Sequence, residues 1–276
     1  MTVIEKNGNI EIVGITNFVL KDTLDCGQAF RWKEINENCF EGIAYNKYLK
    51  IEYKDKSLIL YNTCIGDFEN IWKGYFDLER DYSKIIEIIT ENSIIKDACL
   101  YASGIRILKQ EPWEALCSFI ISQNNNIPRI KGIIERLCEN FGKKNEFGFY
   151  SFPSADIIAS QSLENLQVLR SGFRAKYILD AAKKVSAGEI SLEKLKNIDT
   201  DLARQELMKI YGVGEKVADC TLLFGLGHLN AFPKDVWIKK ALQKLFDGEL
   251  PACTKGFEGI AQQYIFHYVR TSNIEI

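Results

Sequence analysis

The segment Gly212-Val213-Gly214 constrains the fold of this chain more than any other stretch of its sequence. Residues 201–210 before it and residues 215–226 after it both show the apolar spacing of short helices. Glycine adopts backbone angles that other residues resist, so these glycines predict a tight turn between the two helices. We therefore expect a helix-hairpin-helix at residues 201–226, with the free N–H groups of its second helix forming a phosphate site.

Three side chains near this turn suggest chemistry. Lys216 lies in the first turn of the second predicted helix, where the helix dipole disfavours a cation and, with partial burial, favours a neutral, nucleophilic amine. Cys220 shares its face four residues later, and Asp235 reads as the N-cap of another helix. Each residue alone has an ordinary interpretation, as a solvated lysine, a core cysteine or a capping aspartate. The hairpin, the lysine and an aspartate nineteen positions later are much rarer together.

The segment GVGEKVADC, followed by PKDVW, resembles the helix-hairpin-helix-Gly/Pro-Asp superfamily of DNA repair glycosylases. It is most similar to the lysine-bearing 8-oxoguanine DNA glycosylases. The resemblance implies a bifunctional glycosylase and abasic-site lyase that flips 8-oxoguanine out of duplex DNA opposite cytosine and needs no cofactor. Lys216 would attack the sugar and form a Schiff base that leads to β-elimination. Asp235 would stabilise the positive charge that develops on the sugar.

The resemblance assigns recognition of the damaged base to two further segments. LDCGQAFRW, residues 24–32, contains Gly27, whose simplest interpretation is a turn glycine. The resemblance implies that its carbonyl accepts a hydrogen bond from the N7–H of 8-oxoguanine, whereas N7 of guanine is itself an acceptor. Gln262 and Phe266 share a helix face at i, i+4, as in any amphipathic helix. By resemblance Gln262 reads the Watson–Crick edge, Phe266 stacks on the base, and Cys220 covers its other face.

Recognition of the opposite base is assigned to two other segments. The polar run ISQNNNIPRI, residues 121–130, reads alone as a solvated loop. The resemblance implies that Asn124 fills the gap left by the flipped nucleotide and that Arg129 bonds the orphaned base. In LRSGFRAKY, residues 169–177, Phe173 could be a core aromatic, but it has charged neighbours. By resemblance Phe173 is a wedge between bases and Arg174 reads the opposite cytosine.

Phosphate contacts complete the expected site. The backbone N–H groups of Gly212–Gly214 would hold a DNA phosphate, with an optional monovalent cation on the carbonyls of Met208, Ile210 and Val213. No metal is required. The chain departs from the family at Trp237, where many members have a phosphate-binding histidine. That contact is either missing or replaced by the indole N–H.

The composition is compatible with a DNA glycosylase but does not by itself indicate one. The net charge is −2, yet residues 1–100 hold 12 Lys/Arg against 17 Asp/Glu, whereas residues 101–276 hold 23 against 20. None of the eight cysteines forms a CxxC pair, and only Cys253 follows Asp235, so neither a zinc site nor an iron–sulfur cluster is expected. With no apolar run of membrane length and no signal-peptide core, we expect a cytoplasmic protein. We also expect a monomer, associated with the nucleoid in a bacterium.

The expected fold class is α+β. Short alternating segments predict an antiparallel sheet over residues 1–62: NIEIV, NFVL, AFRWKEI, CFEGIAY, YLKIEY and SLILYN. Helical spacing follows at residues 67–75 and 81–90, and from about residue 104 to the end, including a helix at residues 162–169. We expect a sheet domain with helices at residues 1–103 and a helical domain at residues 104–276. The resemblance implies that the sheet is twisted, as in TATA-binding proteins.

Two other functions remain open. The first is a lysine-bearing glycosylase for another oxidised base, which the missing cluster cysteines and the presence of Gly27, Gln262 and Phe266 disfavour. The second is a non-catalytic helix-hairpin-helix module that only holds DNA phosphates. Such a module needs neither Lys216 nor Asp235.

Overall fold

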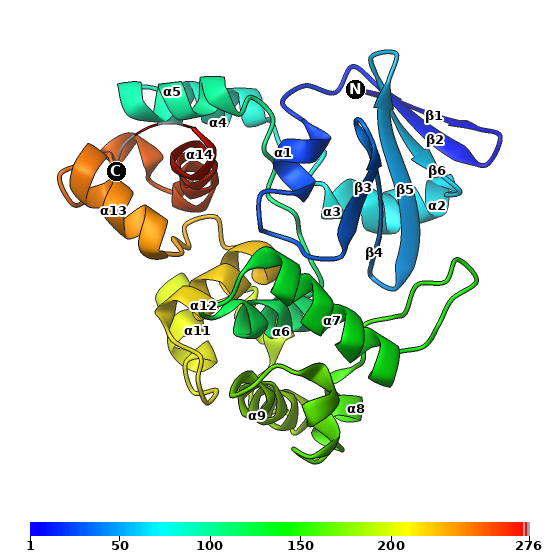
Figure 1. The fold of residues 1–276 in the computed structure, drawn as a ribbon. Helices are drawn as coiled ribbons and strands as arrows, with labels where there is room; N and C mark the ends of the chain where they lie inside the picture. The colour runs from blue at the N-terminus through cyan, green and yellow to red at the C-terminus, as the bar shows by residue number, and fades with distance from the viewer. Residues whose placement is uncertain (273, 275–276) are drawn as a thin grey trace.

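The computed structural model describes residues 1–272 and 274, and it places a six-stranded antiparallel sheet beside a group of helices (Figure 1). The strands are β1 (Thr2–Lys6), β2 (Asn9–Val13), β3 (Trp32–Asn36), β4 (Cys39–Ala44), β5 (Lys47–Lys54) and β6 (Ser57–Tyr61). Their order across the sheet is β1-β2-β6-β5-β4-β3, and every neighbouring pair is antiparallel. The predicted α+β class is confirmed.

One face of the sheet is buried under a short helical segment. Alternate residues of the central strands point to that face, so Ile10, Ile12, Leu49, Ile51, Leu58 and Leu60 are fully buried. The covering segment is α2 (Ile65–Asp67), the π-helical turn η1 (Phe68–Trp72) and α3 (Lys73–Tyr75). Its Trp72 packs edge-on against Trp32 of β3, with ring centroids 6.5 Å apart. These residues form a hydrophobic core of their own.

The other regular elements of the described chain are helical. They are α1 (Leu20–Leu24), α4 (Tyr82–Ile89), α5 (Ser93–Tyr101), α6 (Pro112–Ser122), α7 (Ile127–Phe141), α8 (Ala155–Ala159), η2 (Asn165–Leu169), α9 (Arg174–Ser186), α10 (Leu192–Leu195), α11 (Thr200–Leu207), α12 (Glu215–Thr221), η3 (Leu222–Leu226), α13 (Val236–Leu245), η4 (Ala252–Thr254) and α14 (Glu258–Thr271). Within residues 1–272 and 274, no helix has the length and apolar character needed to cross a bilayer.

The buried helix α6 organises the helical part, because α7, α9, α12 and η3 all pack on it. Helices α4 and α5 come early in the chain but lie against its end, above α14 in Figure 1. Their buried side chains, including Ile85 and Ile95, share one hydrophobic core with the helices from α6 onward. The predicted domain boundary at residue 103 stays a prediction.

Several local predictions were wrong. Asn17–Leu20 is not a strand: Asn17 has a φ of 50°, and a helix begins at Leu20. The backbone carbonyl of Asn17 instead accepts a bond from the buried Arg106 guanidinium. The predicted helix at residues 162–169 is only the 3-10 turn η2, and β1, α5 and α8 were not predicted. These elements are short or lack a clear period.

Candidate active site

Seven of the predicted site residues line one cavity of about 660 Å³. It lies where α7, α12, α13 and α14 meet the loop before β3. The seven are Gly27, Asn124, Gly214, Lys216, Asp235, Trp237 and Phe266. They come from five separate parts of the sequence, so the fold gathers the proposed chemistry and base-recognition groups at one place.

The hairpin has the predicted form. Helix α11 ends at Leu207, and Gly212 then takes a φ of 81°, the left-handed region that favours glycine. A Cβ atom on Gly212 would also collide with the ring of Tyr177, so two separate constraints require glycine here. Gly214 is extended and is the N-cap of α12, with open space where a side chain would be. Its position leaves the first turn of α12 accessible from the cavity.

Lys216 and Asp235 both line the cavity. Lys216 is in the first turn of α12, and its Nζ donates to Oγ of Ser122 at 3.2 Å and lies 5.6 Å from the ring centre of Phe119. Oδ1 of Asp235 accepts from the backbone N–H of Ile238 at 2.8 Å, so its predicted capping of α13 is confirmed. The cap holds one carboxylate oxygen at the cavity wall and leaves the other for a ligand.

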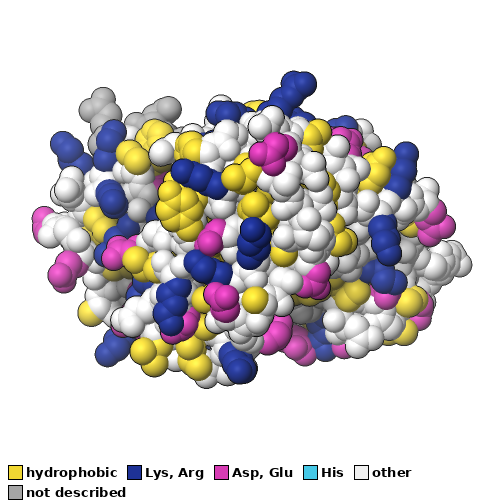
Figure 2. Space-filling model, turned by 90° about the horizontal axis from the view of Figure 1, so that it is seen from below, with side chains coloured by type: hydrophobic (Ala, Val, Ile, Leu, Met, Phe, Trp, Pro, Cys, Tyr) yellow, Lys and Arg dark blue, Asp and Glu magenta, His cyan; other side chains and the backbone are white. Residues whose placement is uncertain are grey.

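The cavity lining is more basic than the chain as a whole. Four cationic side chains line it, Lys216, Lys234, Lys239 and Arg270, whereas Asp235 is the acidic one. On the face seen in Figure 2, basic and acidic side chains are intermixed with hydrophobic ones. The positive charge is therefore concentrated where a phosphate backbone would approach the hairpin.

Gly27 lies next to the proposed stacking residue, Phe266, in the cavity lining. It has a φ of 89°, and an added Cβ would lie 4.0 Å from Cε1 of Phe266 and 3.7 Å from Ile127 and Arg270. Phe266 is half-buried, and the guanidinium carbon of Arg270 lies 5.6 Å from its ring centre. A planar base placed on Phe266 would thus have the Gly27 backbone at its edge.

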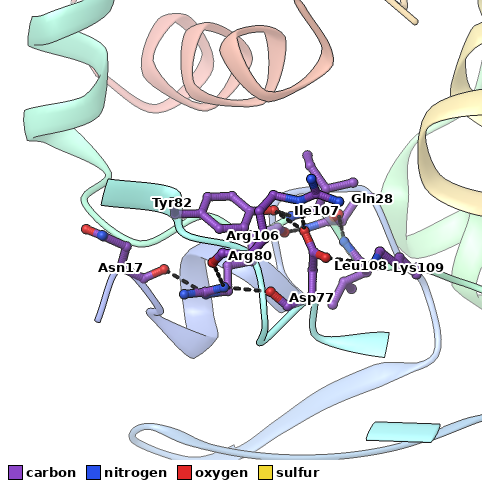
Figure 3. Close-up of polar contacts among 9 residues, drawn as sticks. All are labelled: Asn17, Gln28, Asp77, Arg80, Tyr82, Arg106, Ile107, Leu108 and Lys109. Atoms are coloured by element: carbon purple, nitrogen blue, oxygen red, sulfur yellow. Dashed lines mark hydrogen bonds and ion pairs between the residues drawn. The ribbon is translucent and has the colours of Figure 1, made fainter. Parts of the chain in front are cut away.

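A buried polar network holds the Gly27 segment in place (Figure 3). Gln28 is fully buried: its Nε2 donates to the carbonyls of Thr23 and Arg106, both at 2.8 Å, and its Oε1 accepts from Leu108 N–H at 2.9 Å. Arg106 in turn donates to the carbonyl of Asp77 at 2.7 Å. Every amide atom of Gln28 thereby has a partner, which fixes the backbone beside it.

The residues proposed for the opposite base adopt contrasting environments. Asn124 is exposed and has a φ of 46°, and Phe173 is 45% exposed. Arg129 is exposed, whereas Arg174 is only 2% exposed and donates to the carbonyls of Gln123 and Asn124. Burial lowers the pKa of the Arg174 guanidinium, and the nearby charge of Arg129 lowers it further. The two arginines therefore lie close together beside the cavity.

Two residues predicted for the base pocket, Cys220 and Gln262, do not line the cavity. Cys220 is buried, which raises the pKa of its thiol to about 11, and Gln262 is 4% exposed. Trp237 is 41% exposed, with Nζ of Lys240 5.8 Å from its ring centre. Of the three carbonyls proposed for a cation, that of Ile210 already accepts from Val213 N–H at 3.0 Å. The cation site stays a prediction.

Sequence patterns had not singled out Phe119, Lys239 or Arg270, which also line the cavity. Arg270 had a signal, because it follows Phe266 by four residues on α14 and so shares its face. Ser122 was noted only as part of the polar run, and its contact with Lys216 spans 94 positions.

Two family models together match residues 12–249. Residues 12–116 match the N-terminal domain of 8-oxoguanine DNA glycosylases, and residues 117–249 match HhH-GPD superfamily base excision DNA repair proteins. The chain belongs to the 8-oxoguanine DNA glycosylase family. This glycosylase is 32% identical to the N-glycosylase/DNA lyase of Saccharomyces cerevisiae over 261 residues, which are 82% of this chain and 67% of the yeast protein.

Solved structures agree over almost the whole chain. The 8-oxoguanine glycosylase/lyase of Clostridium acetobutylicum, in complex with duplex DNA that carries cytosine opposite 8-oxoguanine, has a TM-score of 0.93. It is 37% identical, and the match covers 99% of both chains. A structure of MBOgg1 with a low-affinity DNA ligand has a TM-score of 0.92 and 41% identity, covering 98% of both chains. Among the curated relatives the matched share is smaller, between 63% and 67% of the relative's length for the first three.

Proposed function

We propose that this glycosylase removes 8-oxoguanine from duplex DNA opposite cytosine and then cleaves the strand at the resulting abasic site. The observation that carries the proposal is that Lys216 and Asp235 line the same cavity as Gly27 and Phe266. A nucleophile, a carboxylate, a backbone acceptor and a stacking ring are the groups that excision of a flipped purine needs. A module that only binds DNA phosphates needs none of these four groups.

In the proposed reaction, the neutral amine of Lys216 attacks C1′ while the bond from C1′ to the base breaks. The carboxylate of Asp235 stabilises the positive charge that develops on the sugar. Opening of the sugar ring at O4′ leaves a Schiff base between Nζ and C1′. Loss of a proton from C2′ then expels the 3′ phosphate and nicks the strand. The lysine is regenerated when water hydrolyses the Schiff base.

Recognition in the proposed complex uses both strands. The carbonyl of Gly27 accepts the N7–H that distinguishes 8-oxoguanine from guanine. Gln262 reads the Watson–Crick edge and Phe266 stacks on the ring. Arg129 and Arg174 donate to O2 and N3 of the cytosine, while Asn124 and Phe173 occupy the gap and separate the neighbouring bases. Backbone N–H groups of the hairpin, with Trp237 beside them, hold the phosphate.

We also propose that the enzyme acts as a monomer on chromosomal DNA of the nucleoid. The deciding experiment is borohydride trapping on a duplex with 8-oxoguanine opposite cytosine. A covalent protein–DNA complex and release of free 8-oxoguanine are expected. If an oxidised pyrimidine is excised and 8-oxoguanine is not, the rival glycosylase function is correct. If the protein binds a duplex with either lesion but forms no covalent complex with either, it is a non-catalytic binding module.

A further inference from the structure

Ser122, the last residue of α6, has a hydroxyl group whose hydrogen already has a partner. Its Oγ donates to the backbone carbonyl of Phe119 at 2.8 Å. That carbonyl is one of the last four of the helix, where regular N–H partners run out. The N–H of Gln123, which follows Ser122, bonds to the carbonyl of Ile120 instead, at 3.4 Å. The hydroxyl of Ser122 therefore satisfies a carbonyl that the end of α6 leaves open.

The same hydroxyl group contacts the proposed nucleophile. Nζ of Lys216 donates to Oγ of Ser122 at 3.2 Å, and both residues line the cavity. A hydroxyl group has one hydrogen and two lone pairs. Because the hydrogen of Ser122 points to the carbonyl of Phe119, its oxygen offers only lone pairs to Lys216. Ser122 is therefore a hydrogen-bond acceptor toward the amine, and this contact joins α6 to α12 across 94 positions of sequence.

The direction of this hydrogen bond matters for a nucleophile. A neutral amine has two N–H groups and one lone pair, and the lone pair is what attacks a carbon atom. An N–H group held by Ser122 leaves that lone pair free of the contact. A hydroxyl group that donated to the amine would occupy the lone pair and slow the attack. The carbonyl of Phe119, at 2.8 Å against 3.2 Å for the amine, keeps the O–H pointed away from Lys216.

The side chain of Phe119 restricts the amine from a second direction. Its ring is buried, and the ring centre lies 5.6 Å from Nζ of Lys216, which is itself half-buried. A lysine side chain has many rotamers, and fixing one of them costs conformational entropy. The ring of Phe119 and the hydroxyl group of Ser122 limit these rotamers before DNA binds. Less entropy is then lost when the amine is placed for attack.

We propose that Ser122 is a positioning residue that holds one N–H group of Lys216 and leaves the lone pair of the amine free to attack C1′. The inference rests on the proposed function, in which Lys216 forms the Schiff base. It concerns only the bond between Nζ and C1′. At a preformed abasic site, the same amine adds to the C1′ aldehyde and water is lost as the Schiff base forms. Loss of the hydroxyl group should therefore slow Schiff-base formation even where no base has to be recognised.

Single-turnover reactions on a preformed abasic-site duplex, at saturating enzyme and quenched with borohydride at successive times, test the role. In Ser122→Ala the rate constant should fall about fivefold, the equivalent of one neutral hydrogen bond, while affinity for the duplex stays unchanged. Ser122→Thr retains a hydroxyl group that can bond the same carbonyl and should keep most of the rate.

Ser160→Ala is the matched control. Oγ of Ser160 also donates to the carbonyl three residues earlier, that of Ile157, at 2.8 Å, and Ser160 is the C-cap of α8. It does not line the cavity. Its removal tests the loss of such a bond at a helix end without any contact to Lys216, and the rate constant should not change.

The sign and the amplitude of the change separate the alternatives. A faster rate in Ser122→Ala would mean that the hydroxyl group donates to the lone pair and restrains it, which would overturn the proposal. An unchanged rate constant, or a loss that Ser122→Thr shares in full, would overturn it as well. A damaged fold lowers the trapped fraction and not the rate constant, so a loss of amplitude alone would also overturn it. If the wild type traps no abasic-site DNA, the Schiff-base step of the proposed function fails, which is a different result.

Discussion

The two sides of the cavity are built in different ways. The amine wall, which carries Lys216 and Asp235, is positioned locally: a glycine turn starts α12, and Asp235 caps the helix it precedes. The base wall, which carries Gly27 and Phe266, is held by contacts between distant segments. Gln28 reaches Arg106 across 78 positions, and Cys26 reaches Gln263 across 237. The contacts that position the amine wall can therefore be predicted from a local sequence motif, whereas those that hold the base wall have almost no local sequence signal.

This difference predicts that the two walls fail separately. Damage to the amine wall should stop the chemistry while the lesion still binds. Damage to the base wall should weaken lesion recognition, while cleavage of a preformed abasic site continues. A single substitution on one wall that abolishes both lesion binding and cleavage of a preformed abasic site would contradict this separation of roles.

The largest expected effect is at the nucleophile. Lys216→Gln removes the amine but keeps a polar side chain of similar length beside Ser122, so borohydride cross-linking should be abolished and lesion-DNA binding should remain nearly intact. The yield of trapped complex measures cross-linking, and a binding isotherm on the same duplex measures lesion binding. Lys239→Gln is the matched control, because Lys239 also lines the cavity and should still cross-link. Cross-linking by the Lys216 variant would mean that another amine is the nucleophile.

The next effect is at the carboxylate. Asp235→Asn should slow single-turnover base release on the order of 100-fold, as for loss of one group that stabilises transition-state charge. Asparagine caps helices about as well as aspartate, so the free energy of unfolding should change by less than about 1 kcal/mol. Asp199→Asn, at the cap of α11, controls for capping alone. A rate loss accounted for by unfolding would remove Asp235 from the mechanism.

A smaller effect is expected on the base wall. Phe266→Ala should weaken binding to lesion DNA by roughly 1–3 kcal/mol, the range for base–aromatic stacking, and should hardly change binding to undamaged DNA. Fluorescence anisotropy on the two duplexes gives the comparison. Equal losses on both would show that the half-buried ring serves the fold and not the base.

The smallest effect concerns the opposite base. Two guanidinium groups supply only donors, which suit O2 and N3 of cytosine and suit the amino group of adenine badly. Excision opposite cytosine should exceed excision opposite adenine by at least roughly tenfold, and Arg129→Ala should reduce that ratio. Single-turnover rates opposite each of the four bases test both statements. If the variant lowers all four rates equally, Arg129 contacts only phosphate.

The hairpin, the cap at Asp235 and most of the helices could be predicted from sequence because their signals lie within a few residues. Gly212 illustrates this, since its turn is local, although its close approach to Tyr177 is not. The partners of Gln28 and Cys26 had no such signal. A buried glutamine or cysteine looks the same in sequence whether its hydrogen bonds are to a neighbour or to a helix 237 positions away.

Arg174 shows a further limit. The charged residues around Phe173 predicted an exposed tip, and Phe173 is indeed 45% exposed, yet Arg174 itself is 2% exposed. The guanidinium turns inward because the loop before α7 leaves the carbonyls of Gln123 and Asn124 without helical partners. Loop geometry of this kind is decided by the packing of α6, α7 and α9, which a charge pattern does not encode.

The buried state of Arg174 has a consequence for how cytosine would be checked. Its donors are already satisfied by the loop carbonyls, so contact with cytosine exchanges one set of acceptors for another and adds little net affinity. The same exchange would break the hydrogen bond from Arg174 to the carbonyl of Asn124, a residue with a φ of 46°. Loop release and cytosine contact would then be one coupled event, and a base that presents an amino group at this position would leave the N–H donors of Arg174 unmatched. Arg174 would in this way contribute selectivity for the opposite cytosine without raising the affinity for undamaged DNA.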